Sequence, residues 1–386
     1  MQIGFDISAL AEEKTGIGQY RWNLLRELRT QSSEFSILPY GFSFRGYNQL
    51  KRVAQDSCFR RNDKKGIEFK IFQIPRRPLI MSWIFCRQPS LDFFIKNADL
   101  FHVSDNVQPP TKNPTVSTIH DLSAVLFPQF HSSKNVFVDK WRFKQIAKYA
   151  SQVICVSENS KNDFLNKYKL DSDRVHVVYN GVDHSKFFPI QDLFKIQQFK
   201  TKYQLFDPFI LFLGTIEPRK NVLRLVKAYF ELKNQQKIIY KLVICGKKGW
   251  GYEEIFKFIK EKKLEKDVIF LGYIDESEKN LLINSSEFVV YPSLYEGFGL
   301  PVVEALACGK AVITSKNSSL SEVGGDACLY VDAENTNDIS DKIFELIKNQ
   351  NLRKDLEKKS IMESNKFSWE KCAKETFEVY KICQKQ

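Results

Sequence analysis

Short runs of β-branched and aromatic residues alternate with longer helical patterns from one end of this 386-residue chain to the other. This alternation restricts the fold more than any other feature, because strands separated by helices pair in parallel and form a sheet with helices on both faces. In the first half, strands are expected at residues 3–7, 36–40, 100–103, 115–119, 153–156 and 175–178. The clearest helical patterns between them cover residues 19–28 and 136–150.

A second series of strands and helices follows a polar stretch near residues 190–208. Its strands are expected at residues 209–213, 241–245, 268–271, 288–291 and 311–314, and its helices at residues 192–203, 222–233, 252–262 and 301–307. Phe188 and Pro189 interrupt the pattern between the two series. The chain is therefore predicted to form one α/β domain over residues 1–190 and another over residues 191–366. The helix of the last segment, residues 367–386, is expected to pack back on the first domain.

The chain is basic, with 58 Lys and Arg against 46 Asp and Glu and a net charge of +12. The excess is concentrated between Arg45 and Arg87, where there are 11 basic residues and 3 acidic ones, so a negatively charged partner is expected there. The longest uncharged apolar run of this region, residues 79–86, is far shorter than the roughly 20 residues of a membrane-spanning helix. The initial sequence MQIGFDISAL carries Asp6 and no basic cluster, which favours a first strand over a signal peptide and predicts a cytoplasmic protein.

The cysteines and histidines give no sign of a metal site. Eight cysteines are scattered without a C-x-x-C pair, and those at positions 155, 245 and 308 lie among apolar or small residues. They are interpreted as reduced core thiols. The five histidines show no metal-ligand spacing, so no structural zinc site is expected.

The first segment with a chemical signature is FILFLGTIEPRKN, residues 209–221, in which a buried strand runs into Gly214 and then into a turn with Arg219 and Lys220. Cations at the carboxyl end of a parallel strand, next to a helix N-terminus, suit a diphosphate. Arg offers a planar fork and Lys a mobile point charge, so the pair can hold two phosphoryl groups. An isolated Arg-Lys pair is more often simply solvated, and it is the strand–turn–helix context that favours binding.

The second segment is YPSLYEGFGLPVVEALACGKAVITS, residues 291–315. Gly297 and Gly299 permit a loop whose backbone N–H groups approach a ligand, and a proline begins the following helix. Glu304 lies among apolar residues of that helix, and a buried carboxylate needs donors, which the two hydroxyls of a ribose would supply. Glu296, one loop earlier, is placed to meet a transferred sugar. The alternative is that neither glutamate binds a ligand. Glu304 would then be an ordinary residue on the helix surface, and Glu296 an ordinary residue of a turn.

Two other enzyme classes compete for these motifs. A pair of carboxylates can serve as the acid and base of a glycoside hydrolase, but the cationic turn at Arg219 and Lys220 has no purpose in hydrolysing a neutral glycoside. A dinucleotide oxidoreductase would require a fuller G-x-G-x-x-G pattern, and Gly16-Ile17-Gly18 lacks the third glycine. Transfer from a diphosphate is the preferred interpretation.

Four motifs in order resemble glycosyltransferase family 4: residues 16–18 (GIG), 120–121 (HD), 217–221 (EPRKN) and 296–304 (EGFGLPVVE). The resemblance covers nearly the whole chain and is weakest between about residues 41 and 97. Members of that family are retaining nucleotide-sugar enzymes with the GT-B fold, in which two Rossmann-like, doubly wound parallel-sheet domains face a central cleft. The resemblance implies a donor site mainly in the C-terminal domain, an acceptor site mainly in the N-terminal domain, and no metal or other cofactor.

Carried over to this sequence, the resemblance implies catalytic roles for Arg219 and Lys220 on the donor diphosphate, for Glu296 on the transferred sugar, and for His120 facing that sugar. Glu304 would bind the ribose. The other residues expected to bind the donor are Gly16, Gly18, Gly214, Gly272, Tyr273, Ile274, Gly297, Phe298, Gly299 and Leu300.

The first-domain motifs are less specific than those of the second domain. The glycine turn reads T-G-I-G where many relatives have two adjacent glycines. Taken alone, His120 is equally well explained as a satisfied core histidine, and the turn at residues 16–18 as a plain strand-to-helix connection. Asp121 is expected to cap a helix or to orient the imidazole.

Aromatic residues are interleaved with the cations of the region from Arg45 to Arg87, and they include Phe59, Phe72, Trp83 and Phe85. This combination suits an anionic membrane surface, where a lipid-linked acceptor would lie. The same composition occurs in proteins that bind single-stranded nucleic acid and on plainly solvated helix faces. The partners predicted here are a nucleotide-sugar donor, a glycan or lipid-linked acceptor and an anionic membrane surface, and not nucleic acid.

Two stretches bear on the sugar: HDLSAVLFPQF, residues 120–130, and ICGKKGWGYEEI, residues 244–255. They are similar to stretches of bacterial enzymes that build O-antigen and other surface polysaccharides, often mannosyltransferases using GDP-mannose. The resemblance therefore favours transfer of mannose from GDP-mannose in lipopolysaccharide or surface polysaccharide biosynthesis. Glucose, galactose or N-acetylhexosamine linked to UDP remain open, and so does a nucleotide-sugar epimerase, which shares the architecture and needs no acceptor.

Overall fold

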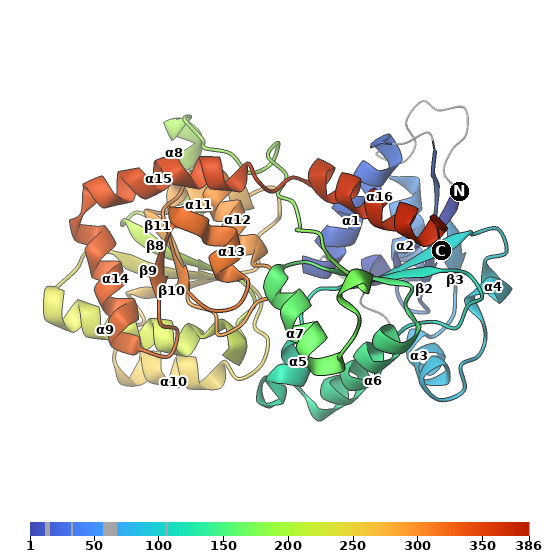
Figure 1. Cartoon of the computed structure of the whole chain (residues 1–386). Coiled ribbons are helices and arrows are strands. Elements are labelled where there is room, and N and C mark those ends of the chain that lie inside the picture. Colours follow the sequence, from blue (N-terminus) through green and yellow to red (C-terminus); the bar gives the residue numbers. More distant parts are fainter. Residues whose placement is uncertain (12–15, 32–33, 57–67, 105–106, 386) are drawn as a thin grey trace. The chain divides into compact units, whose positions relative to one another are not determined.

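The computed structural model describes residues 1–11, 16–31, 34–56, 68–104 and 107–385 (Figure 1). The chain divides into two compact units. The first consists of Met1–Gly181 together with Trp369–Gln386, and the second is Val182–Ser368. Residues 182–190 pack within the second unit, where the Phe188 and Ile190 N–H groups donate to the side-chain oxygens of Asn280 and Asn284.

The described strands of the first unit form one parallel sheet in the order β3-β2-β1-β4-β5-β6-β7. They are β1 (Gln2–Asp6), β2 (Ser36–Phe42), β3 (Lys70–Phe72), β4 (Leu100–Ser104), β5 (Thr115–Ile119), β6 (Gln152–Cys155) and β7 (Val175–Val177). The strand order reverses between β1 and β4. In doubly wound sheets, ligands bind outside the carboxyl ends of the strands at such a switch point.

The second unit repeats this plan with the parallel order β10-β9-β8-β11-β12-β13 among its described residues. The strands are β8 (Phe209–Leu213), β9 (Lys241–Cys245), β10 (Val268–Gly272), β11 (Phe288–Tyr291), β12 (Val312–Ser315) and β13 (Cys328–Val331). Its switch point lies between β8 and β11, the two strands that precede the cationic turn and the glutamate loop.

Helices connect these strands. Those of the first unit are α1 (Gly16–Gln31), α2 (Tyr47–Gln55), α3 (Arg76–Phe85), α4 (Leu91–Phe94), α5 (Ser123–Leu126), α6 (Ser133–Tyr149), α7 (Glu158–Tyr168) and α16 (Trp369–Lys385), with short 3-10 turns η1 (Ser8–Ala11), η3 (Pro128–Phe130) and η4 (Ser172–Arg174). Those of the second unit are α8 (Leu193–Lys202), α9 (Val222–Gln236), α10 (Glu253–Glu261), α11 (Lys279–Ser285), α12 (Leu300–Ala307), α13 (Leu320–Gly324), α14 (Thr336–Lys348) and α15 (Gln350–Ser364), with η5 (Pro218–Lys220) and η6 (Gly325–Ala327).

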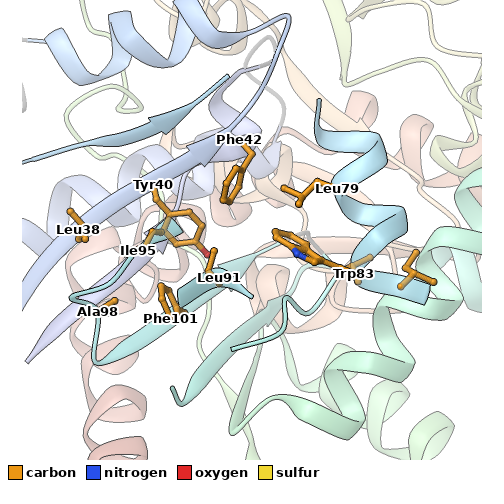
Figure 2. Close-up of a cluster of buried hydrophobic side chains, with 11 residues drawn as sticks. Leu38, Tyr40, Phe42, Leu79, Trp83, Leu91, Ile95, Ala98 and Phe101 are labelled. Carbon is orange, nitrogen blue, oxygen red and sulfur yellow. The ribbon is translucent and has the colours of Figure 1, made fainter. Parts of the chain in front are cut away.

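The core of the first unit includes a cluster of aromatic and aliphatic side chains from β2, β4, α3 and the α4 segment (Figure 2). Tyr40 and Phe42 point from β2 into this cluster, where the Phe42 ring packs edge-on against Trp83 of α3, which is 1% exposed. The Trp83 indole N–H donates to the Pro89 carbonyl oxygen at 2.9 Å, so its polar atom is satisfied. Trp83 was expected to belong to a membrane-facing surface, and that expectation is wrong for this side chain because the indole is needed to fill the core.

The last helix packs back on the first unit, as the sequence predicted, and its partner there is the first helix, as Figure 1 shows for α16 and α1. Apolar residues recur along α16 at helical spacing and are buried, among them Ala373, Phe377 and Tyr380. The Tyr380 hydroxyl lies 2.5 Å from His102 Nδ1, and both groups are buried. The carboxyl-terminal helix is therefore bonded to the central sheet of the first unit.

The structure corrects some local predictions. Residues 16–18 form the first turn of α1 and not a separate turn before it. Strands β3 and β13 were not predicted, because β3 is only three residues long and both carry partly exposed side chains that dilute the apolar signal. Seven cysteines fall in the described residues and all are free thiols, but Cys86 is exposed and is not a core thiol. Within the described residues, no helix has the length and apolar character needed to cross a membrane.

Candidate active site

The turn after β8 is fixed by side chains that reach across the sheet. Asn221 follows η5 with φ of 61°, a left-handed conformation that Asn tolerates better than most residues. Its side-chain amide donates to the carbonyl oxygens of Pro292 and Ala333 at 3.0 and 2.7 Å, just beyond β11 and β13. Arg219 and Lys220, which precede Asn221, are thereby held at the carboxyl ends of the strands beside the switch point.

The loop after β11 is joined to this turn by its backbone and by serines. The Leu294 N–H donates to the Arg219 carbonyl oxygen at 2.8 Å. Ser318 Oγ accepts from the Glu296 N–H at 3.1 Å, and Ser319 Oγ donates to the Glu296 carbonyl oxygen at 2.9 Å. Glu296 is therefore placed from both sides, and its carboxylate lies next to the cationic turn.

Two cations and two carboxylates form a compact, buried cluster at this point. Arg219 Nη1 donates to Glu296 Oε2 at 2.9 Å, and Arg219 Nη2 donates to Glu217 Oε1 at 2.8 Å. Lys220 Nζ donates to Glu296 Oε1 at 2.5 Å and to the Tyr291 hydroxyl at 2.6 Å. The four charged side chains are all at most 12% exposed. The structure thus brings together Arg219, Lys220 and Glu296, three of the residues that the sequence assigned to the donor site.

This arrangement fixes the charge of Glu296. Burial acts to raise the pKa of Glu296, but Arg219 and Lys220 outweigh it and lower the pKa to about 2. The pKa of Lys220 is lowered, first by burial and then by the neighbouring Arg219, while Glu296 and Glu217 oppose that decrease. Glu296 therefore remains a carboxylate throughout the physiological range and compensates the two cations.

The helix after Glu296 begins in the way the glycines and the proline predict. Gly299 has φ of 104° and directly precedes α12, whose first turn contains Pro301. The backbone conformation favours glycine, and a Cβ atom at this position would lie 2.7 Å from Leu320 Cδ2 and would have to displace that methyl group. Leu300 is the first residue of α12, and Gly297 and Phe298 are buried in the preceding loop. The Phe298 ring packs edge-on against Phe367, so the side chain serves the core.

Glu304 is buried in α12 as predicted, but it already has a partner. Lys279, the first residue of α11, places Nζ 2.6 Å from Glu304 Oε2. Burial raises the pKa of Glu304 to about 7, because it outweighs the attraction of Lys279. Burial alone would lower the pKa of Lys279, but Glu304 and Glu276 raise it above its ordinary value. Lys279 therefore supplies a charge partner from the protein, in addition to the ribose hydroxyls that the sequence suggested for this carboxylate.

The backbone at the end of β10 has free space beside it, as expected of a place where part of the donor binds. Gly272 has φ of 69°, and a Cβ atom there would meet nothing within 4 Å. Tyr273 is 55% exposed and its ring lies below the Lys247 ammonium, 4.8 Å away, whereas Ile274 is buried. Gly214 directly follows β8, and its N–H donates to the Cys245 carbonyl oxygen of the neighbouring strand β9 at 2.9 Å. The second-unit donor-binding candidates thus lie at the carboxyl ends of β8, β10 and β11.

The first-unit candidates lie at the ends of β4 and β5 and at the start of α1. His120 follows β5, and its Nε2 is 2.8 Å from Ser104 Oγ at the end of β4. The Tyr20 ring of α1 packs edge-on against the His120 imidazole, with ring centroids 4.6 Å apart. Asp121 Oδ1 accepts hydrogen bonds from the Ser123 N–H and hydroxyl groups, so this side chain closes a local turn just before α5. Gly16 and Gly18 lie in the first turn of the same helix, four and two residues before Tyr20.

The site contains residues that the sequence did not single out. Glu217 and Tyr291 stood within the quoted motifs, and Ser293 donates to Glu296 Oε1 at 2.7 Å from the same loop. Lys279 carried no sequence signal, because a Lys in a Lys- and Glu-rich segment is usually solvated. Within the described residues, His, Cys, Asp and Glu side chains form no cluster of three or more that could hold a metal ion.

Comparison with known proteins assigns the fold and the family. Residues 15–186 match the family described as Glycosyltransferase Family 4, and residues 194–362 match that described as Glycosyl transferases group 1. An uncharacterized glycosyltransferase of Methanocaldococcus jannaschii is 31% identical over 69% of this chain and 68% of its own. O-antigen chain mannosyltransferase B of Escherichia coli is 26% identical over 99% of this chain and 100% of its own. The crystal structure of HepE from Anabaena in complex with UDP and glucose has a TM-score of 0.71 and 18% identity, covering 99% of both chains.

The two parallel sheets and the returning last helix define a GT-B protein, and the predicted fold class is confirmed. The chain belongs to glycosyltransferase family 4 and is a hexosyltransferase, as the motifs indicated.

Proposed function

We propose that this enzyme transfers mannose from GDP-mannose, with retention of configuration, to a glycan or lipid-linked acceptor during the synthesis of a surface polysaccharide. The similarity to an O-antigen mannosyltransferase over the full length of both chains supports the choice of sugar and pathway. The stretches at residues 120–130 and 244–255 support it as well. The acceptor would bind to the first unit on the cytoplasmic side of the membrane.

The observation that carries the proposal is the cation cluster at the switch point between β8 and β11. A diphosphate binds where N–H donors and positive charges converge at the carboxyl ends of parallel strands. Lys220 has three N–H donors, and Glu296 and Tyr291 take two of them, which leaves one for a phosphoryl oxygen. The carboxylates hold the cations in position beforehand, so little reorganisation is needed when the donor binds.

The proposed mechanism follows from where charge develops. When the bond between the anomeric carbon and the phosphate breaks, negative charge grows on the leaving diphosphate and positive charge on the sugar ring. Arg219, Lys220 and the N-terminus of α12 stabilise the leaving group. Glu296 keeps the two cations aligned and adds a negative charge near the ring. For retention, the acceptor hydroxyl attacks from the side of the departing phosphate, whose oxygen takes the proton.

A donor screen tests this function. Thermal unfolding and release of nucleoside diphosphate are measured with GDP-mannose, UDP-glucose, UDP-galactose and UDP-N-acetylglucosamine. We expect GDP-mannose to give the largest stabilisation and the fastest release. The alternative is a UDP-sugar donor, which the likeness to a protein crystallised with UDP and glucose favours. Preference for a UDP-sugar would overturn GDP-mannose but keep the transferase, whereas no response to any nucleotide sugar would contradict the donor site itself.

We further propose that the basic region from residue 45 to residue 87 contacts an anionic membrane surface. The described part of this region exposes both cations and apolar side chains: Arg45, Lys51, Arg52, Arg77, Phe44, Met81 and Phe85. The Phe85 ring lies next to Trp141 of α6, with ring centroids 6.2 Å apart. Phe59, Arg60, Arg61, Lys64 and Lys65 lie outside the described residues. Apolar side chains among cations favour anionic lipid headgroups over a purely solvated face.

Vesicle sedimentation tests the membrane proposal. Wild-type protein should bind vesicles that contain phosphatidylglycerol more strongly than vesicles of phosphatidylcholine alone, and salt should weaken the binding. Phe85→Ser should reduce binding several-fold. Phe206→Ser, which removes an exposed aromatic ring from the second unit, is the control and should leave binding unchanged. Binding that does not respond to anionic lipid would contradict the proposal.

A further inference from the structure

Lys279 and Glu304 form an ion pair that is separate from the cluster around Glu296. Lys279 Nζ lies 2.6 Å from Glu304 Oε2 and 3.6 Å from Glu276 Oε1. The Lys279 and Glu304 side chains are only 14% and 4% exposed. Apolar side chains of similar volume are often at least as stable as a buried ion pair, so the fold does not require this pair for stability.

The pair lies close to Cys245 at the end of β9, next to the donor-binding candidates at the end of β10. The Lys279 ammonium is close enough to oppose the rise in pKa that burial imposes on the Cys245 thiol, at the end of β9. Cys245 Sγ and the Gly246 N–H both donate to the Gly272 carbonyl oxygen, at 3.3 and 2.8 Å. On its other side the ammonium lies 5.4 Å from the centre of the Phe187 ring, an arrangement that favours a cation.

The two oxygens of the Glu304 carboxylate have different surroundings. Among the described residues, Oε2 is fully buried, and its contact with the Lys279 ammonium is an ion pair without regular hydrogen-bond geometry. No hydrogen bond reaches Oε1 in this part of the chain, and Oε1 is not one of the fully buried atoms that lack a partner. A carboxylate oxygen has two lone pairs, so Oε1 can accept two hydroxyl groups of one ribose. The protein thus engages one oxygen and leaves the other for a ligand.

We propose that Lys279 is a positioning residue for donor binding: it holds Glu304 by Oε2 and favours its ionised form, so that Oε1 accepts hydrogen bonds from the ribose hydroxyls of the nucleotide sugar. The inference rests on the proposed role of Glu304 in ribose binding. Lys279 itself does not touch the ribose in this arrangement, and it acts through Glu304 alone.

The proposal predicts a pH dependence of donor binding. The titratable and charged groups that act on Glu304 are Lys279 of α11, Glu276 before that helix and Cys308 at the end of α12. With burial as the largest cause, the pKa of Glu304 is raised to about 7 while Lys279 opposes the increase. Donor affinity should therefore weaken as the pH falls below about 7. Without Lys279 the pKa rises further, so the loss should begin at a higher pH.

Calorimetric titration across pH 6 to 9 tests this role, with GDP-mannose and UDP-glucose as probes. Their phosphates are diesters and lack the ionisation near pH 6 of a phosphate monoester, so the probes contribute little to the profile. Lys279→Met should bind the preferred probe about tenfold more weakly at pH 7 and approach wild-type affinity at pH 9. Lys279→Arg should restore most of the affinity, because the charge returns. Lys233→Met breaks another Lys–carboxylate pair, with Asp267 before β10, and should leave the profile unchanged.

Further variants separate this proposal from the ribose role on which it rests. If Glu304→Gln leaves the affinity unchanged, the ribose role itself fails. If Glu304→Gln weakens binding about tenfold but Lys279→Met keeps the wild-type pH profile, only the positioning role fails. Should Lys279→Met not fold, the double variant Lys279→Met/Glu304→Gln removes both charges and leaves none buried alone. It should bind the probe as Glu304→Gln does, because the two side chains act as one unit, and an additional loss in the double variant would overturn the proposal.

Discussion

Glu296 and Glu304 lie in the same loop-and-helix segment and are both buried, but their surroundings give them opposite electrostatic behaviour. Burial is the largest single influence on each and acts in the same direction. At Glu296, Arg219 and Lys220 outweigh it and lower the pKa to about 2. At Glu304, Lys279 is opposed by Glu276, and the pKa rises to about 7.

The comparison shows that burial alone does not decide the charge of a carboxylate. Glu296 accepts hydrogen bonds from two cations and from the hydroxyls of Ser293 and Tyr291. Glu304 has one cation on one oxygen. The first region is therefore suited to hold fixed cations for a diphosphate, and the second is suited to an acceptor whose strength changes near neutral pH.

The largest expected effect belongs to the Glu296 region. Arg219→Ala should lower kcat by about a hundredfold or more, equivalent to about 3 kcal/mol, because a donor to the leaving group is lost. Release of nucleoside diphosphate at saturating donor measures it. Lys227→Ala, on the exposed face of α9, is the control and should stay within about twofold of wild type. A loss of less than tenfold for Arg219→Ala would contradict the leaving-group role.

Removal of the compensating carboxylate should cost stability. Glu296→Ala leaves two buried cations without their shared partner and should lower the free energy of unfolding by about 3 kcal/mol, measured by urea denaturation. Glu345→Ala breaks the more exposed pair with Lys342 and should change it by about 0.5 kcal/mol or less. Pyrophosphate should stabilise Glu296→Ala more than wild type, because it replaces the missing negative charge. If pyrophosphate stabilised the wild type and Glu296→Ala equally, Glu296 would not be the group that compensates the two cations, and the contrast with the Glu304 region would fail.

The Glu304 region should instead show a pH-dependent stability. Folding raises the pKa of Glu304, so the stability that this carboxyl group contributes is fully present below about pH 4.5. That stability is lost as the pH rises through 7. Between pH 5 and 8, Lys279→Met/Glu304→Gln should gain about 2 kcal/mol relative to wild type. Urea denaturation at several pH values measures the difference.

Glu296 provides the contrast within the same pH series. Its lowered pKa contributes stability above about pH 4.5 that is lost only as the pH falls toward 2, so it should add no slope between pH 5 and 8. A stability difference between wild type and Lys279→Met/Glu304→Gln that stays constant over this range would show that Glu304 does not titrate there.

The smallest expected effect concerns the hydroxyl that joins the two charges of the first region. Tyr291→Phe keeps the ring, which stacks on Phe212, but removes a group that accepts from Lys220 and donates to Glu296. It should lower the free energy of unfolding by about 1 kcal/mol and weaken donor binding a few-fold. Tyr229→Phe loses a hydroxyl bonded to the Tyr240 carbonyl oxygen and should cost similar stability without a change in donor affinity. Identical donor affinity in the two variants would place Tyr291 outside the donor site.

Much of the fold was predictable because its signals are local in sequence. The strands from β8 to β12 were located to within a residue or two, since apolar runs bounded by turn residues predict buried parallel strands. The second-unit motifs also placed Arg219, Lys220 and Glu296 at strand ends that converge in a parallel sheet, but they did not predict the ion pairs between these side chains. Short β3 and the segment carrying Lys279 gave no such signal.

The sequence by itself determined the class of the protein, the order of its strands and helices, and the residue types at the switch point, since these depend on periodicity and on motifs read along the chain. Only the tertiary structure decided which charges meet. It paired Glu304 with Lys279 across 25 residues and placed Trp83 in the core and not on a surface. A charge partner or a burial depth depends on distances between segments that are far apart along the chain, and the electrostatic character of each glutamate follows from those distances.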